Sequence, residues 1–134
     1  MALSSENTGL VILDTNILIY SASKPFNLES EMRRMGFSRI AVPSFVLDEL
    51  CSIGRSFDKR GKFARLALQI AQRFARIESD VGGADVDVDE KIVQLARAMG
   101  CTVATADAAL RRRLMSEGIR VLLLKDRMII DPRG

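Results

Sequence analysis

Apolar runs of strand length alternate along this chain with longer segments of helical periodicity, and this alternation constrains the fold more than any other feature. The predicted strands are Leu10–Leu13, Arg39–Val42, Phe74–Ile77, Thr102–Ala104 and Arg120–Leu124, with Met128–Ile130 as an edge strand. The predicted helices begin at Ser44, Lys59, Asp89 and Asp107. Strands and helices in this order predict an α/β fold, a three-layer α/β/α sandwich with a parallel sheet of about five strands.

Length and apolar content predict one domain. The 134 residues, 48% of them hydrophobic, are enough to build a single substantial core. We expect the domain to span 1–134, with a core over about 10–125 and loose ends at 1–8 and 131–134. The chain has no apolar run of membrane-spanning length and no signal-peptide pattern, so we expect a cytoplasmic protein that does not contact membranes.

The composition excludes several catalytic mechanisms. The chain has no histidine, so triads with a histidine base and histidine-ligated zinc sites are excluded. Cys51 and Cys101 lie too far apart for a CxxC motif, and we expect reduced core residues, with a disulfide as the alternative. A net charge of +3 permits an anionic partner without requiring one.

Acidic residues gather where the predicted strands end. In the stretch "GLVILDTNILIY", Asp14 directly follows a buried strand, and Asp107 follows the fourth strand. Asp89 begins the third predicted helix, and Glu49 lies one turn into the first. Carboxylates brought together at one sheet edge repel one another, and Mg²⁺ or Mn²⁺ would relieve that repulsion. Taken singly, the three aspartates could instead be helix N-caps and Glu49 a solvated helix residue.

Four stretches resemble the PIN domain, a compact metal-dependent nuclease fold found in bacterial toxins, archaeal stand-alone proteins and ribosomal-RNA processing factors. They are "LDTNILIY", "VPSFVLDEL", "DVDEKIVQLARAMGCTVATADAALRRRL" and "GIRVLLLK". The resemblance covers about 11–124 and is strongest to archaeal stand-alone, rRNA-processing-like members. It implies a metal-dependent endoribonuclease with a Mg²⁺ or Mn²⁺ cofactor, acting in rRNA processing, in RNA turnover or as a toxin. The implied partners are RNA, a second copy of the chain, and an antitoxin or ribosome-assembly protein.

The resemblance also implies roles for single residues. It assigns metal binding and catalysis to Asp14, Glu49, Asp89 and Asp107, and it assigns orientation of those carboxylates to Asn16 and Thr105. Asp89 is preferred because Ile92, three residues later, matches the family's D-x-x-I register, and Asp87 is the alternative. Ala108 and Ala109 stand where many relatives carry a further polar or acidic residue.

An RNA substrate requires cationic contacts outside the acidic pocket. The candidates are Arg55, Lys59, Arg60 and Lys62 in "RSFDKRGK", and Arg111 and Arg112 just after Asp107. The alternative for each cluster is a solvated helix face. Tyr20 is the one aromatic residue that we expect to be exposed for base stacking.

Two rival functions follow from the same residues. A catalytically weak PIN domain would act as an RNA-binding or ribosome-assembly scaffold. A receiver-like α/β domain would use an acidic pocket for Mg²⁺ and phosphate, and Lys125 would be the lysine that such domains carry at the end of a later strand. Receiver domains normally have a pair of acids near the first strand, however, and "LDTN" supplies only one.

Overall fold

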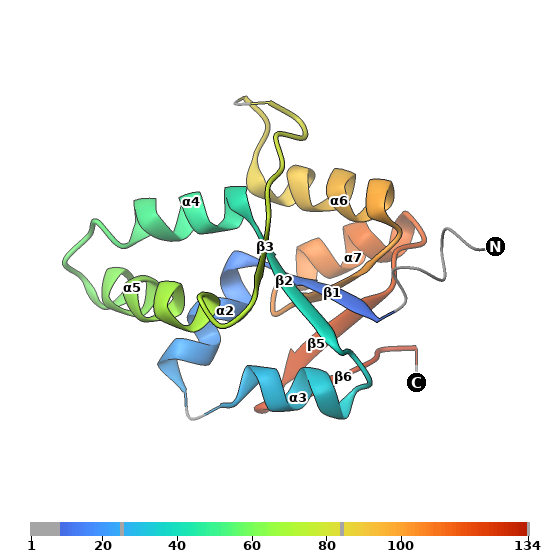
Figure 1. The fold of residues 1–134 in the computed structure, drawn as a ribbon, viewed down its shortest axis with the longest axis horizontal. Coiled ribbons are helices and arrows are strands. Elements are labelled where there is room, and N and C mark those ends of the chain that lie inside the picture. The colour runs from blue at the N-terminus through green and yellow to red at the C-terminus, as the bar shows by residue number, and fades with distance from the viewer. Residues whose placement is uncertain (1–8, 25, 84, 134) are drawn as a thin grey trace.

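The protein is described here by a computed structural model covering residues 9–24, 26–83 and 85–133. Its centre is a six-stranded sheet with the order β3-β2-β1-β4-β5-β6 (Figure 1). The strands are β1 (Leu10–Leu13), β2 (Arg39–Pro43), β3 (Ala75–Ile77), β4 (Thr102–Thr105), β5 (Val121–Lys125) and β6 (Met128–Ile130). The first five are parallel and β6 is antiparallel to β5, which confirms the predicted mostly parallel α/β/α fold and its edge strand.

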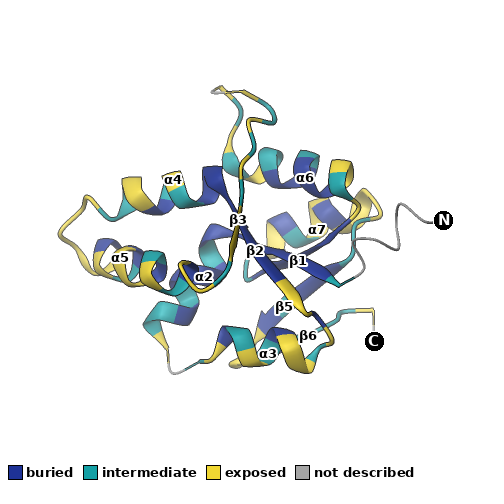
Figure 2. Ribbon diagram, viewed as in Figure 1, coloured by how far each residue is buried: buried dark blue, intermediate teal, exposed yellow. Residues whose placement is uncertain are grey.

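Six helices flank the sheet in the described part of the chain. They are α2 (Thr15–Ser23), α3 (Leu28–Arg34), α4 (Ser44–Ile53), α5 (Lys59–Ala71), α6 (Val88–Met99) and α7 (Ala108–Ser116). Helices α2, α4 and α5 pack against one another, and α3 packs against β6. Figure 2 shows β1 and most of β2 buried at the centre, surrounded by helices that carry both buried and exposed residues. No helix among the described residues has the length and apolarity needed to cross a membrane.

The register of the sheet positions the candidate site. Leu13, the last residue of β1, pairs with Ala104 of β4, so Asp14 and Thr105 lie next to each other at the carboxyl edge of the sheet. Ile12 and Val103, one pair earlier, are fully buried, and they hold this edge against the core. The pairing of two apolar strands therefore brings together two polar residues that are 91 positions apart.

Several local predictions differ from the structure. The sequence did not predict helices α2 and α3, because α2 is apolar on every side from Ile17 to Tyr20 and α3 has only seven residues. Cys101 is buried and Cys51 is exposed on α4, so the prediction of two core cysteines is wrong for Cys51, and neither forms a disulfide.

The predicted loose ends are corrected in part. Residues 1–8 and 134 lie outside the described residues. At the other end, the Asp131 carboxylate accepts a hydrogen bond from Arg120 Nε at 3.1 Å and another from the backbone N–H of Arg133 at 2.9 Å. The bond from Arg120 therefore ties Asp131 to the residue before β5, while the bond from Arg133 closes a turn within 131–133.

Gly61 provides a stability test of the α4–α5 connection. A Cβ added at this position would lie 2.0 Å from the carbonyl oxygen of Ser56, so the backbone would have to move. We expect Gly61→Ala to destabilise the protein by about 3 kcal/mol in urea unfolding. Gly9→Ala is the control, because its Cβ would meet only the Ser38 hydroxyl at 3.3 Å. A loss for Gly61→Ala no larger than for Gly9→Ala would contradict the close approach.

Candidate functional site

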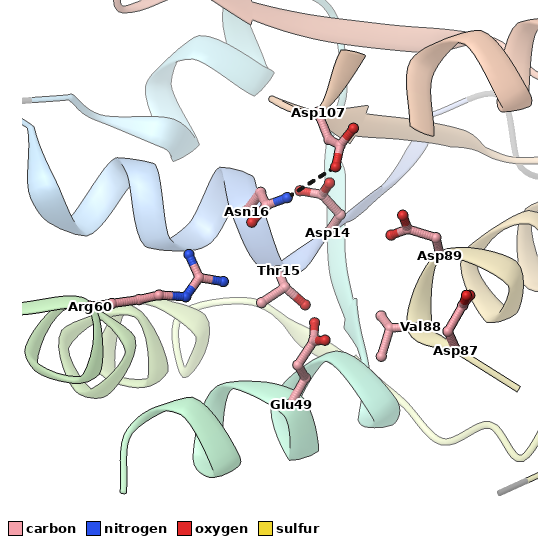
Figure 3. A pocket seen from close by; sticks show the side chains of 9 residues that line it. All are labelled: Asp14, Thr15, Asn16, Glu49, Arg60, Asp87, Val88, Asp89 and Asp107. Carbon is pink, nitrogen blue, oxygen red and sulfur yellow. Dashed lines mark hydrogen bonds between the residues drawn. The ribbon is translucent and has the colours of Figure 1, made fainter. Parts of the chain in front are cut away.

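A polar pocket of about 270 Å³ opens at the carboxyl edge of the sheet (Figure 3). Its acidic lining residues come from four parts of the chain that are far apart in sequence. They are Asp14 after β1, Glu49 on α4, Asp87 and Asp89 at the start of α6, and Asp107 after β4. Thr15, Asn16, Arg60 and Val88 complete the lining. The fold thus brings all the predicted acidic residues, and the alternative Asp87, to one cavity.

Asp14 is the buried end of this pocket. Only 2% of the residue is exposed, and its carboxylate caps α2 by accepting a hydrogen bond from the Ile17 N–H at 2.8 Å. Its second oxygen accepts a hydrogen bond from the Thr105 hydroxyl. That hydroxyl in turn accepts from the Asp107 N–H at 2.9 Å. Thr105 therefore links the carboxylate of Asp14 to the backbone of Asp107.

Burial dominates the electrostatics of Asp14. Loss of water raises the pKa of Asp14 to about 7, because the charged form is disfavoured away from solvent. The hydrogen bonds from Thr105 and Ile17 lower that pKa, while the carboxylates of Asp89 and Asp107 raise it. Among the described residues no ion pair includes Asp14, so its charge is not offset by a neighbouring basic side chain.

Asp107 and Asn16 form a second hydrogen-bonded pair at the carboxyl edge of the sheet. One carboxylate oxygen of Asp107 caps α7 by accepting from the N–H groups of Ala109 at 2.8 Å and Leu110 at 3.1 Å. The other oxygen accepts from Asn16 Nδ2 at 3.3 Å (Figure 3). The amide of Asn16 thus helps to fix the orientation of a carboxylate 91 positions away.

The start of α6 contributes two acids to the pocket, and one of them is also the cap of the helix. Asp87, not Asp89, is the N-cap, because the Asp87 carboxylate accepts from the Glu90 N–H at 2.9 Å. The interpretation of Asp89 as the first residue of this helix and as an N-cap candidate is therefore wrong, since the helix starts at Val88. Asp89 lies in the first turn, and Figure 3 shows its carboxyl group directed toward Asp14 and Asp107. Partial burial raises the pKa of Asp89, and nearby Asp107, Asp87 and Glu49 raise it further.

Thr15, which the sequence did not single out, also lines the pocket. It is 5% exposed, and its hydroxyl oxygen has no hydrogen-bond partner although the atom is buried. Figure 3 shows this oxygen on the pocket side, near the carboxyl group of Glu49. A buried hydroxyl without a partner is costly unless a ligand or water satisfies it. The signal in the sequence was its place directly after Asp14.

These residues fit a hard divalent cation in their chemistry. The pocket offers carboxylate and hydroxyl oxygens, the ligands that Mg²⁺ and Mn²⁺ prefer, and the mutual repulsion of its acids is not relieved by an ion pair. As they stand, however, no three acidic or cysteine side chains among the described residues converge closely enough to coordinate one ion. The arrangement is an acidic pocket in which one or two carboxylates, with hydroxyl or water oxygens, would hold a cation.

Comparison with known proteins assigns the family. A family model described as a PIN like domain matches residues 11–127, most of the chain. The chain belongs to the PIN domain family. Its curated relative Ribonuclease VapC9 of Archaeoglobus fulgidus is 30% identical over 116 residues, which cover 86% of this chain and 82% of that protein.

Solved structures agree with this PIN domain assignment. The PIN domain endonuclease Utp24 is 26% identical, with a TM-score of 0.69 over 93% of this chain and 92% of the other. A domain of a functionally unknown protein from Methanocaldococcus jannaschii has the same fold at 15% identity, with a TM-score of 0.67 over 88% and 92% of the two chains. The family and fold expected from the sequence are both confirmed.

The predicted RNA-binding residues of this PIN domain do not all lie at the pocket. Arg60 lines it, whereas Arg55, Lys59 and Lys62 are exposed elsewhere on the α4–α5 connection and on α5. Arg112 is exposed on α7, and Arg111 is half-buried, with an Nε atom that has no hydrogen-bond partner. Of the described residues, Arg60 is thus the one basic side chain that lines the acidic pocket.

Tyr20, the residue predicted to be exposed for base stacking, is not the most accessible aromatic side chain. Tyr20 is only partly exposed and packs against the hydrophobic core. The described aromatic residue that is fully accessible is Phe57, at 99% exposure. Phe57 lies in a loop without periodicity, so the sequence pattern gave no measure of its exposure.

Proposed function

We propose that this PIN domain is an endoribonuclease that hydrolyses RNA phosphodiester bonds with Mg²⁺ or Mn²⁺ bound in the acidic pocket. The observation that carries the proposal is the convergence of acids from four chain segments on one pocket without an ion-pair partner among the described residues. The names of two relatives, a ribonuclease and a PIN domain endonuclease, support nuclease activity. We propose that the whole of 1–134 is one such domain.

Each pocket residue has a role in this proposal. Asp14, Glu49, Asp89 and Asp107 would hold the cation. Thr105 and Asn16 keep the carboxylates of Asp14 and Asp107 in place through their hydrogen bonds. The Thr15 hydroxyl provides a further oxygen donor, and Arg60 offers a positive charge for a phosphate of the substrate.

A bound divalent cation would supply Lewis acidity, which activates water for attack on phosphorus and offsets negative charge on the phosphate. The protein's own contribution is to hold acids from four segments of the chain around one pocket. Because the chain has no histidine, no imidazole base can take the place of the cation in this chemistry.

The proposal is tested by incubating a labelled single-stranded RNA with the purified protein in Mn²⁺, Mg²⁺ or EDTA. We expect cleavage in at least one metal and none in EDTA. A protein that cleaves equally in EDTA would rule out the cation as a participant.

Separate variants of Asp87 and Asp89 test which acid of α6 takes part. Asp87→Asn should retain at least half of the activity, because asparagine also caps helices well and Asp87 is the cap. Asp89→Asn should lower cleavage about a hundredfold, because it removes a charge that faces the pocket. Initial cleavage rates at saturating metal measure both, and the reverse order would make Asp87 the pocket ligand.

A scaffold that binds RNA or a ribosome-assembly partner is the second candidate function. It is favoured by the absence of three converging ligands among the described residues and by Ala108 and Ala109 after Asp107. A protein that is stabilised by metal in thermal unfolding yet inert toward RNA would support this candidate over the enzyme.

The biological setting is part of the proposal. VapC9 is named as a ribonuclease and Utp24 as a PIN domain endonuclease, and the toxin and rRNA-processing roles are both open to this chain. An antitoxin, a ribosome-assembly protein and a second copy of the chain are the corresponding partners, and the cytoplasm is the corresponding location. Copurification of the protein with RNA or with another polypeptide from its native cells separates these settings.

A further inference from the structure

Phe57 is the most exposed large hydrophobic side chain among the described residues, at 99%. It lies in the loop between α4 and α5, which extends away from the sheet at the left of Figure 1. The loop is held in place, because Arg65 Nη1 donates to the carbonyl oxygens of Gly54 at 2.7 Å and Ser56 at 2.9 Å. The Phe57 ring is thus exposed to solvent on a loop whose backbone is fixed by hydrogen bonds from Arg65.

The local fold does not account for this ring. Phe57 precedes Asp58, which caps α5 by accepting from the Gly61 N–H at 2.8 Å. A hydrophobic residue before a cap is often packed against an apolar residue in the first turn of the helix, and the corresponding position here is Lys62. Phe57 therefore lacks the intrachain packing that would explain it.

A basic groove lies beside the same loop. It has a volume of about 460 Å³ and runs between α2 and α5, where its lining includes Lys24, Lys59, Arg60 and Phe63. Arg60 also lines the acidic pocket, so the two cavities share one residue. Lys59 is two residues from Phe57, so their Cα atoms are at most about 7 Å apart. The groove thus begins within two residues of Phe57 along the chain and shares Arg60 with the acidic pocket.

We propose that Phe57 and the α2–α5 groove form a binding site for single-stranded RNA outside the acidic pocket. A base stacks on the Phe57 ring, and the phosphates are bound by Lys24, Lys59 and Arg60. This combination of an aromatic platform with a cationic track is the usual chemistry of single-strand binding. We also infer that the bound RNA continues past Arg60 to the acidic pocket, and this step rests on the proposed function.

The charges around Phe57 favour RNA over a second copy of the chain. Arg55, Lys59, Arg60 and Lys62 surround the ring in sequence, and the carboxylate of Asp58 is used in capping. Two copies meeting at this surface would bring like charges together, which disfavours association. A phosphate backbone is complementary to the same surface.

The test is fluorescence anisotropy of a labelled oligouridylate and of a labelled RNA duplex in EDTA, over a range of salt concentrations. Phe57→Ala should weaken oligouridylate binding about tenfold or more, and leave the slope of affinity against salt unchanged, because stacking involves no charge. Phe57→Tyr keeps a ring and should bind like the wild type. Met128→Ala removes a different exposed apolar side chain, on β6, and should also bind like the wild type.

Lys59→Ala should act differently from Phe57→Ala. It removes one phosphate contact, so the slope of log affinity against log salt should decrease by about 0.7. Duplex RNA should bind more weakly than the oligouridylate, and Phe57→Ala should not alter duplex binding, because paired bases are not free to stack on the ring.

Metal-dependent cleavage measured in parallel distinguishes the two proposals. If the wild-type protein cleaves RNA and the Phe57→Ala variant binds the oligouridylate as tightly as the wild type, the second site is overturned and the proposed activity stands. Binding that depends on Phe57 in a protein that never cleaves would overturn the proposed activity and support the site. A Phe57→Ala variant that turns a dimer into a monomer at unchanged RNA affinity would overturn the site and make Phe57 a contact between copies.

Discussion

Replacing Asp14 by Asn is expected to lower metal-dependent RNA cleavage about a thousandfold while the protein remains folded. The loss follows from removing the buried charge at the base of the acidic pocket, which the proposed cation needs. The fold is retained because asparagine is also a good N-cap, and its side-chain oxygen can still accept from the Ile17 N–H. Cleavage rates in Mn²⁺ and Mg²⁺, with circular dichroism of the same samples, measure both effects.

Asp58→Asn is the matched control for this variant. Asp58 is also an aspartate that caps a helix, through a hydrogen bond from the Gly61 N–H at 2.8 Å, but it does not line the acidic pocket. The same substitution there should leave cleavage within about twofold of the wild type. Equal activity of Asp14→Asn and the wild type would show that the acidic pocket is not the catalytic site.

The fold could be predicted from the sequence because its central strand, β1, is apolar at every position. Leu10–Leu13 is buried at every position, as expected for a strand covered on both faces, and it pairs on both sides with parallel strands. The residue that breaks such a run has to be at the sheet edge, so the placement of Asp14 followed from the same pattern. The convergence of the other acids depended on strand order, for which the family resemblance was the guide.

The details that sequence could not supply depend on local hydrogen bonding and exposure. The family register favours Asp89 over Asp87, but only the bond from the Glu90 N–H shows that Asp87 is the helix cap, while both acids line the pocket. The unpartnered hydroxyl of Thr15 and the full exposure of Phe57 are properties of packing, and hydrophobic periodicity carries no information on either. These are also the residues on which the new proposals depend most.

The metal-free protein is expected to lose about 2–3 kcal/mol of stability between pH 5 and pH 8. The pKa of Asp14 is raised to about 7 in the folded protein, mainly by burial, whereas an aspartate in the unfolded chain titrates near 3.9. Between these two values the unfolded chain has released a proton that the folded protein still holds, so stability falls as the pH rises. The fall ends above the folded pKa, where both states are ionised.

Other carboxylates do not cancel this effect in the chosen range. The pKa values of Glu29, Glu31, Glu90, Glu117 and Asp131 are lowered by hydrogen bonds, chiefly from arginines and the backbone, so these groups are ionised in both states above pH 5. The raised pKa of Asp89 acts in the same direction as that of Asp14. Urea unfolding in EDTA at several pH values measures the slope, and Asp14→Asn should remove most of it.

Mn²⁺ should reverse this loss at the upper end of the pH range. A cation bound among ionised carboxylates stabilises the folded state, by about 2.7 kcal/mol at a concentration one hundred times its dissociation constant. Because protons compete for the same oxygens, the stabilisation by Mn²⁺ should grow as the pH rises through 7. Asp14→Asn should show neither the pH slope nor the full response to Mn²⁺. If the variant keeps both, the buried carboxyl of Asp14 is a helix cap and the cation, if bound, is held by the other acids of the pocket.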